Sequence, residues 1–191
     1  FLGFHVIKSL ELIAYEGPIG RSNLSLRLET GEGATRTLVS RLKSHGLIAV
    51  SKKGCLLTKR GEKIWREFQL IFPRKVNLDR SELSLAAYSV AVHIRGVADK
   101  VRLGMEQRDA AIIASASGAV TLVFKNGQLN LPGMSEDAAH YYPIAFRQIR
   151  EQFDLKENDV VVIGSADSWI KAERGALAAA WTLIENNGFK K

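Results

Sequence analysis

Hydroxyl and guanidinium side chains gather on one side of a short segment, TRTLVSRLKSHGLI (35–48). Leu38, Val39 and Leu42 recur there at helical spacing, which predicts a helix with one buried face. The opposite face carries polar residues concentrated in its first half: Thr35, Arg36, Thr37, Ser40 and Arg41. Side chains of these types hydrogen-bond to base edges in the major groove of duplex DNA. The segment is therefore a candidate for a helix that reads bases.

Further basic residues lie where they could hold a phosphate backbone. Lys43 follows in the same helix, and Arg21 precedes it. Lys52 and Lys53 form a turn between two short apolar runs. Each of these basic side chains, taken singly, could equally belong to an ordinary solvated surface. The prediction of DNA binding therefore rests on all of them together.

The net charge of +7 is divided unevenly along the chain. Residues 1–80 hold 15 Lys and Arg against 7 Asp and Glu, whereas residues 81–191 hold 12 against 13. All of the excess positive charge therefore lies in the first 80 residues. This distribution indicates a segment that binds a polyanion, joined to a segment with another role. A basic surface that is merely solvated would give the same balance.

The elements that would position these residues can be predicted from apolar periodicity and from glycine and proline. Besides the polar helix, which Gly46 would end, we expect helices over residues 4–15, 22–29 (capped by Ser22) and 59–72 (capped by Thr58). Residues 47–50 and 55–58 read as the strands of a β-hairpin around SKKG. We place this domain at residues 1–75 and expect residues 73–82 to form a linker.

The order of helix, helix, helix, hairpin, helix resembles a winged helix-turn-helix domain. The resemblance is carried by SNLSLRLETGEGATRTLVSRLKSHGLIAVSKKGCLLTKRGEKI (22–64). SRLKSHGLI, a basic hairpin and LTKRGEKI are similar to the MarR- and ArsR-like regulators of bacteria and archaea. The resemblance implies binding to double-stranded DNA. Winged helices also serve as protein-binding modules, which leaves that alternative open.

The second half predicts strands and helices without strict alternation, so we expect an α+β fold with a small mixed sheet over residues 83–191. Expected strands are 83–94, 110–115, a hairpin around Asn126-Gly127 and 159–164, and expected helices are 97–110, 136–153 and 167–187. The whole chain resembles archaeal two-domain regulators whose C-terminal domain is uncharacterised. The resemblance is carried by residues 104–133 and 159–181. That resemblance implies no particular ligand.

Two places in the second half could bind a small molecule. VVVIGSADS runs from a strand into a helix, and its Ser165, Asp167 and Ser168 lie where open sheets bind anions. Simple helix capping explains the same residues, and the acidic Asp167 disfavours a phosphate. Arg108 and Asp109 precede an apolar run and could line a pocket or form a structural ion pair.

Nothing in the sequence has the spacing of a catalytic or metal-binding group. His5, His45, His93 and His140 lack metal-ligand spacing, and Cys55 is the only cysteine. Phosphate-binding loops, G-x-G-x-x-G and G-x-S-x-G are absent. We therefore predict no enzyme activity, no cofactor and no metal. No run of eighteen apolar residues occurs, so no membrane segment is expected.

Together these features predict a cytoplasmic, DNA-binding transcriptional regulator that forms a homodimer, because a single module of this size contacts only a half-site. Its second domain would sense a small-molecule effector or pair the subunits. The alternative is a metabolite-binding module or enzyme in the second domain, with a winged helix that contacts protein.

Overall fold

The structure is a computed structural model that describes residues 3–134 and 137–184. The chain divides into two compact units, Phe1–Leu70 and Ile71–Lys191. Each unit has its own core and is described by itself below. None of the described helices is long and apolar enough to cross a membrane.

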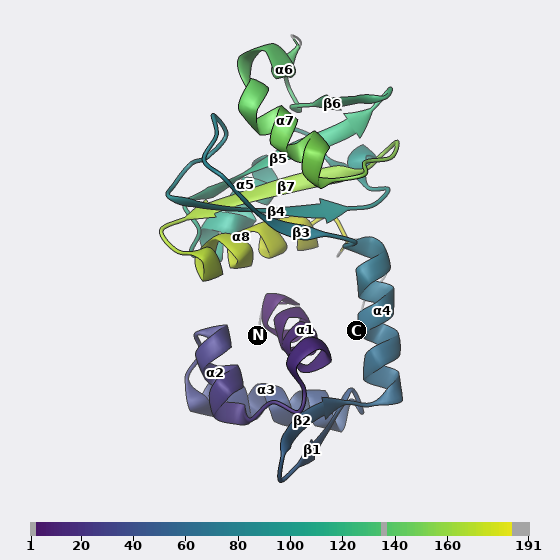
Figure 1. Cartoon of the computed structure of the whole chain (residues 1–191), viewed down its shortest axis with the longest axis vertical. Coiled ribbons are helices and arrows are strands. Elements are labelled where there is room, and N and C mark those ends of the chain that lie inside the picture. The colour runs from purple at the N-terminus through teal and green to yellow at the C-terminus, as the bar shows by residue number, and fades with distance from the viewer. Residues whose placement is uncertain (1–2, 135–136, 185–191) are drawn as a thin grey trace. The chain divides into compact units, whose positions relative to one another are not determined.

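The first unit contains the helices and the hairpin predicted from the sequence (Figure 1). Its elements are α1 (Gly3–Glu16), α2 (Arg21–Leu28), α3 (Glu32–Ser44), β1 (Ile48–Ser51), β2 (Gly54–Leu57) and α4 (Lys59–Ile71). The antiparallel hairpin of β1 and β2, called the wing below, pairs Ile48 with Leu57 and Ser51 with Gly54. The core between the helices and the wing includes Leu24, Leu28 and Leu38, each at most 2% exposed.

Local signals fix the ends of the elements on both sides of the wing. Gly46 has φ +69, and Leu47 N–H donates to the carbonyl of Leu42 at 2.9 Å, which closes α3. Thr58 caps α4 by accepting from Gly61 N–H at 3.1 Å, as predicted. The prediction for Ser22 was wrong. Gly20 takes the N-cap position of α2 in an extended conformation and has no side chain to make the cap bond.

The second unit is built on a five-stranded sheet of order β3-β4-β7-β5-β6. Its strands are β3 (Lys75–Leu78), β4 (Tyr88–Ile94), β5 (Gly118–Lys125), β6 (Gln128–Asn130) and β7 (Val160–Ala166). Every ladder is antiparallel, which confirms the α+β class and corrects the expected mixed sheet. β7 is the last of the described strands in the sequence, but in the sheet it lies between β4 and β5 and runs antiparallel to both.

Helices cover both faces of this sheet (Figure 1). On one face, α6 (Ala138–Tyr141) and α7 (Pro143–Gln152) pack onto a core that includes Leu122, Phe146 and Ile163. On the other, α5 (Met105–Ile113) packs against α8 (Trp169–Trp181), and α8 lies on β4 and β7. The short 3-10 helix η1 (Ala98–Lys100) precedes α5. All seven residues of β7 are buried, because both of its faces are covered.

Several predictions for the second half differ from the structure. The helix expected over residues 97–110 begins only at Met105, after η1. The expected linker contains β3, which pairs with β4. Residues 110–113 belong to α5 and residues 114–115 to the turn that follows it, instead of forming a strand, since a short apolar run does not distinguish helix from strand by periodicity. The strand predicted from residue 83 begins at Tyr88, after a turn. Residue 136 and residues 185–187 of the predicted helices lie outside the described residues.

Candidate nucleic-acid interface

The inward face of α3 consists of Thr35, Leu38, Val39 and Leu42, all of which are buried. The three aliphatic residues are those predicted to anchor the helix in its own domain. Helical geometry then turns Arg36, Thr37, Ser40, Arg41 and Lys43 to the surface, and all five are exposed. The exposed face thus carries two arginines, a lysine and two hydroxyl groups.

Thr35 does not belong to that exposed face, contrary to the prediction. Its side chain is 1% exposed, and its hydroxyl donates to the carbonyl of Gly31 and lies 2.8 Å from the hydroxyl of Thr30. These bonds secure the first turn of α3. The sequence pattern did not separate Thr35 from Thr37 because both flank Arg36 and only the packing of α2 against α3 sets where the buried stripe begins.

A cleft of about 440 Å³ lies between α3 and the wing. Its lining comes from the start of α2, one edge of α3 and the tip of the wing: Gly20, Arg21, Arg36, Val39, Ser40, Lys43, Val50, Ser51, Lys52, Lys53, Gly54 and Cys55. We call it the basic cleft. Five of its lining residues are cationic and none is acidic. The structure thus brings together Arg21, Arg36, Ser40, Lys43, Lys52 and Lys53, which were predicted separately along the sequence.

Backbone contacts between Ile19 and Cys55 hold Arg21 beside the wing. Ile19 N–H donates to the carbonyl of Cys55 at 3.1 Å, and Cys55 N–H donates to the carbonyl of Ile19 at 2.8 Å. Gly54 permits this approach, since a Cβ there would come within 2.7 Å of the Ile19 backbone and the residue has φ +131. Arg21 follows two residues after Ile19 and so lines the cleft.

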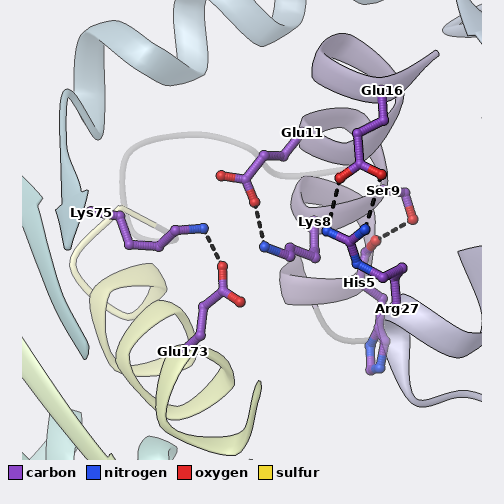
Figure 2. Close-up of polar contacts among 8 residues, drawn as sticks. All are labelled: His5, Lys8, Ser9, Glu11, Glu16, Arg27, Lys75 and Glu173. Carbon is purple, nitrogen blue, oxygen red and sulfur yellow. Dashed lines mark hydrogen bonds and ion pairs between the residues drawn. The ribbon is translucent and has the colours of Figure 1, made fainter. Parts of the chain in front are cut away.

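The five cations of the basic cleft form no ion pair within the part of the chain that the structure describes. Elsewhere in the same unit four cations lie near carboxylates. Lys8 pairs with Glu11 at 2.7 Å and Arg27 with Glu16 at 2.8 Å, and Figure 2 shows both pairs. Lys63 and Arg66 on α4 lie 3.9 and 3.7 Å from Glu67 and Glu62. Five cations without an ion pair among the described residues are therefore gathered around the cleft, as phosphate binding requires.

The remaining predicted DNA-binding residues, Thr37 and Arg41, lie on α3 outside the lining of the cleft. The Thr37 hydroxyl donates to the carbonyl of Gly33 at 3.1 Å, which leaves its lone pairs as acceptors. A smaller hollow of about 70 Å³ joins Arg21 and Arg36 to Ser22 and Glu32 at the N-terminal end of α3. Glu32 is thus a carboxylate beside two cations of the basic cleft.

Two residues of the cleft with a hydroxyl or thiol side chain, Ser51 and Cys55, were not predicted as site residues from the sequence. Ser51 shapes the tip of the wing, since its hydroxyl accepts from Lys53 N–H at 3.1 Å and donates to the carbonyl of Gly54. A serine beside Lys-Lys-Gly was the available signal. Cys55 lines the cleft although its side chain is 0% exposed. Burial raises the pKa of its thiol, and the nearby charge of Arg21 offsets only part of that rise, so Cys55 stays a thiol at neutral pH.

The candidate ligand residues of the second unit are all engaged in local contacts. Arg108 and Asp109 form an exposed ion pair at 2.9 Å on α5, not at the entry to a strand. Ser165 is fully buried, and its hydroxyl lies 2.9 Å from that of Ser89. Asp167 pairs with Lys171 at 2.9 Å, while Ser168 caps α8.

Other polar contacts of the second unit are also internal. Lys75 of β3 pairs with Glu173 of α8, as Figure 2 shows, and both side chains are largely buried. Among the described residues no cluster of three or more His, Cys, Asp or Glu side chains could hold a metal ion. The basic cleft with the adjoining face of α3 is therefore the principal candidate site of the described chain.

Each of the two units matches a known protein family. Residues 85–183, more than half of the chain, match the family described as Domain of unknown function (DUF4443). The chain belongs to the DUF4443 family. Residues 4–72 of this DUF4443 protein match the family described as CggR N-terminal DNA binding domain. An N-terminal DNA-binding domain is thus followed by a domain of unknown function, and this combination indicates a transcriptional regulator.

A solved structure is similar to this chain over nearly its whole length. The chain is similar to "Hypothetical protein PH0730 from Pyrococcus horikoshii OT3", with a TM-score of 0.75 and 27% sequence identity. The similarity covers 96% of this chain and 92% of that one. This match and the two family matches confirm the predicted resemblance to two-domain archaeal proteins with an N-terminal DNA-binding domain. No curated protein matches the DUF4443 protein.

Proposed function

We propose that this DUF4443 protein is a regulator that binds specific sequences in double-stranded DNA through α3 and the wing. The observation that carries the proposal is the group of five cations around the basic cleft, which form no ion pair with the residues that the structure describes, next to an exposed helix face of arginines and hydroxyls. An α-helix of this kind fits the major groove, which is about 12 Å wide. Cations at the wing and at Arg21 then meet phosphates on the flanking backbone.

In this proposal, residues 1–75 contact DNA and residues 83–191 have one of two roles. The second domain binds a small-molecule effector, or it joins two subunits so that two copies of α3 reach successive half-sites. An effector would alter DNA binding only if it bound one arrangement of the subunits better than the other. The protein acts without an enzymatic step.

Fluorescence anisotropy of a labelled duplex from the region upstream of the protein's own gene tests DNA binding. We expect tighter binding to this duplex than to a scrambled one, and a steep loss of affinity from about 50 to about 200 mM salt. Replacing Lys52 and Lys53 together by alanine should make the slope of log K against log salt shallower by about 2, since each lysine neutralises about one phosphate.

Lys63→Ala is the matched control for this experiment. Lys63 is an exposed lysine of the same unit, but it lies near Glu67 and outside the basic cleft. Its removal should leave affinity and salt slope unchanged. If the wild-type protein binds neither duplex even at low salt, the proposal fails and the basic unit is better explained as a protein-docking module.

A further inference from the structure

We infer that the two edges of α3 have different tasks on DNA: Arg36 and Lys43 hold one phosphate strand in the basic cleft, and Arg41 on the other edge reads a base. The inference rests on the proposed function and assigns its specificity to a residue. It also revises the prediction from sequence, in which Arg36 and Arg41 both read bases.

The helical positions of the arginines separate them. Arg36, Ser40 and Lys43 follow i, i+4, i+7 spacing, so they lie along one strip of α3. Arg41 comes five residues after Arg36 and is turned about 140° around the helix axis from it. The lining of the basic cleft agrees with this geometry, because it includes Arg36, Ser40 and Lys43 and leaves out Arg41.

The shape of the cleft indicates what Arg36 contacts. A helix about 10–12 Å across fills a major groove about 12 Å wide, so a sugar-phosphate strand runs along the helix on the side of the wing. The wing stands beside the Arg36 edge, and Lys52 and Lys53 face α3 across the cleft. A backbone strand is the part of the duplex that fits between a helix in the groove and a wing outside it. Its negative charge matches the five cations of the lining.

The chemistry of the opposite edge favours base reading. Arg41 is exposed, and a guanidinium group has the two parallel N–H donors that pair with O6 and N7 of guanine. The neighbouring Thr37 hydroxyl already donates to the carbonyl of Gly33, so it remains an acceptor for base amino groups. Arg41 is the exposed cation of α3 that lies outside the phosphate-binding cleft.

Paired substitutions test this division. A duplex selected from a random pool by the full-length wild-type protein is compared with a scrambled duplex by anisotropy, over about 50 to about 200 mM salt. Arg36→Ala should weaken binding to both duplexes by the same factor and make the salt slope shallower by about 0.9. Arg36→Lys should restore both properties, since a phosphate accepts any positive charge.

Arg41→Ala should instead reduce the preference for the selected duplex by about 5- to 150-fold, with a smaller effect on the scrambled one. Arg41→Lys should not restore the preference, because lysine lacks the planar fork of donors. Arg66→Ala, which removes an exposed arginine that lies 3.7 Å from Glu62 on α4, is the control and should change neither measurement. Equal melting temperatures would show that all variants are folded.

Two results would overturn the division. One is that Arg36→Ala abolishes the preference for the selected duplex and leaves the salt slope unchanged. The other is that both alanine variants affect the two duplexes equally. If the wild-type protein selects no duplex at low salt, DNA binding itself fails, and that result is distinct because it precedes any variant.

Discussion

His93 and Asp159 are the clearest example of a residue-scale feature that the fold creates. His93 Nε2 lies 2.7 Å from Asp159 Oδ2, and each side chain is 3% exposed. Asp159 also accepts hydrogen bonds from the backbone N–H groups of Gly96 and Lys156. Burial lowers the pKa of His93, and the hydrogen bond and charge of Asp159 offset that decrease only in part. The imidazole is therefore neutral in the folded protein at neutral pH.

This pair predicts a loss of stability in mild acid. The folded-state pKa of His93 lies below the unfolded value of about 6.5, so the unfolded chain binds the proton more readily. The free energy of unfolding should therefore decrease as the pH falls below about 6.5, by at most about 1.4 kcal/mol per pH unit from this group. Urea unfolding at several pH values measures the decrease, and His93→Gln should have a flatter profile.

An NMR titration of the His93 ring gives an independent check, because it does not depend on the stability of a variant. The ring should remain neutral at pH values where an exposed histidine is already protonated. A midpoint at or above about 6.5 would contradict the assigned environment.

At the scale of elements, close backbone contact between β7 and α8 organises the second unit. A Cβ at Gly164 of β7 would come within 2.6 Å of the carbonyl oxygen of Ala172 and 2.5 Å of the backbone nitrogen of Ala176. Both neighbours are backbone atoms of α8, so no side-chain rotation can relieve the overlap. Small residues on α8 therefore serve packing against the sheet.

Gly164→Ala should destabilise the second unit by at least about 2 kcal/mol, because β7 and α8 would have to separate. Scanning calorimetry of the full chain measures the effect as a lower transition temperature. Gly33→Ala is the control. Gly33 lies in α3 with nothing within 4 Å of its added Cβ, and alanine there should leave stability unchanged or raise it by about 0.5 kcal/mol. Equal effects of both variants would argue against close packing at Gly164.

At the scale of the whole molecule, the boundary between the basic and the nearly neutral part of the sequence lies close to the boundary between the two structural units. Residues 1–70 carry 12 Lys and Arg against 6 Asp and Glu, a net charge of +6, whereas residues 71–191 carry 15 against 14. The unit with the DNA-binding domain is thus the one that a polyanion would attract. The DUF4443 unit is close to neutral, so this electrostatic attraction does not extend to it.

We expect the full chain to be a dimer, because one winged helix reads only a half-site. Light scattering after size-exclusion chromatography should give about 42 kDa, twice the 21.1 kDa of the chain. A duplex with two half-sites about 10 base pairs apart should bind one dimer. A mass of one chain, together with binding of one chain per duplex, would refute the dimer and leave effector sensing as the role of the second domain.

The sequence alone was sufficient for the features that depend on local periodicity and capping. Helices of the first unit, the wing, the α3 anchor of Leu38, Val39 and Leu42, and the hairpin at Asn126-Gly127 each follow from residues near one another in the chain. Both central residues of that hairpin have positive φ, which asparagine and glycine tolerate. The concentration of charge in the first 80 residues is likewise a property of composition.

Tertiary structure decided the features that depend on long-range packing. The packing of α2 on α3 buries Thr35, and the contact of Ile19 with Cys55 brings Arg21 to the wing. The position of β7 between β4 and β5 joins His93 to Asp159, 66 residues apart in sequence. Such pairings are set by which apolar faces bury one another, and several arrangements satisfy the same local pattern. The basic cleft itself therefore exists only in the folded chain, although its cations could be identified from the sequence.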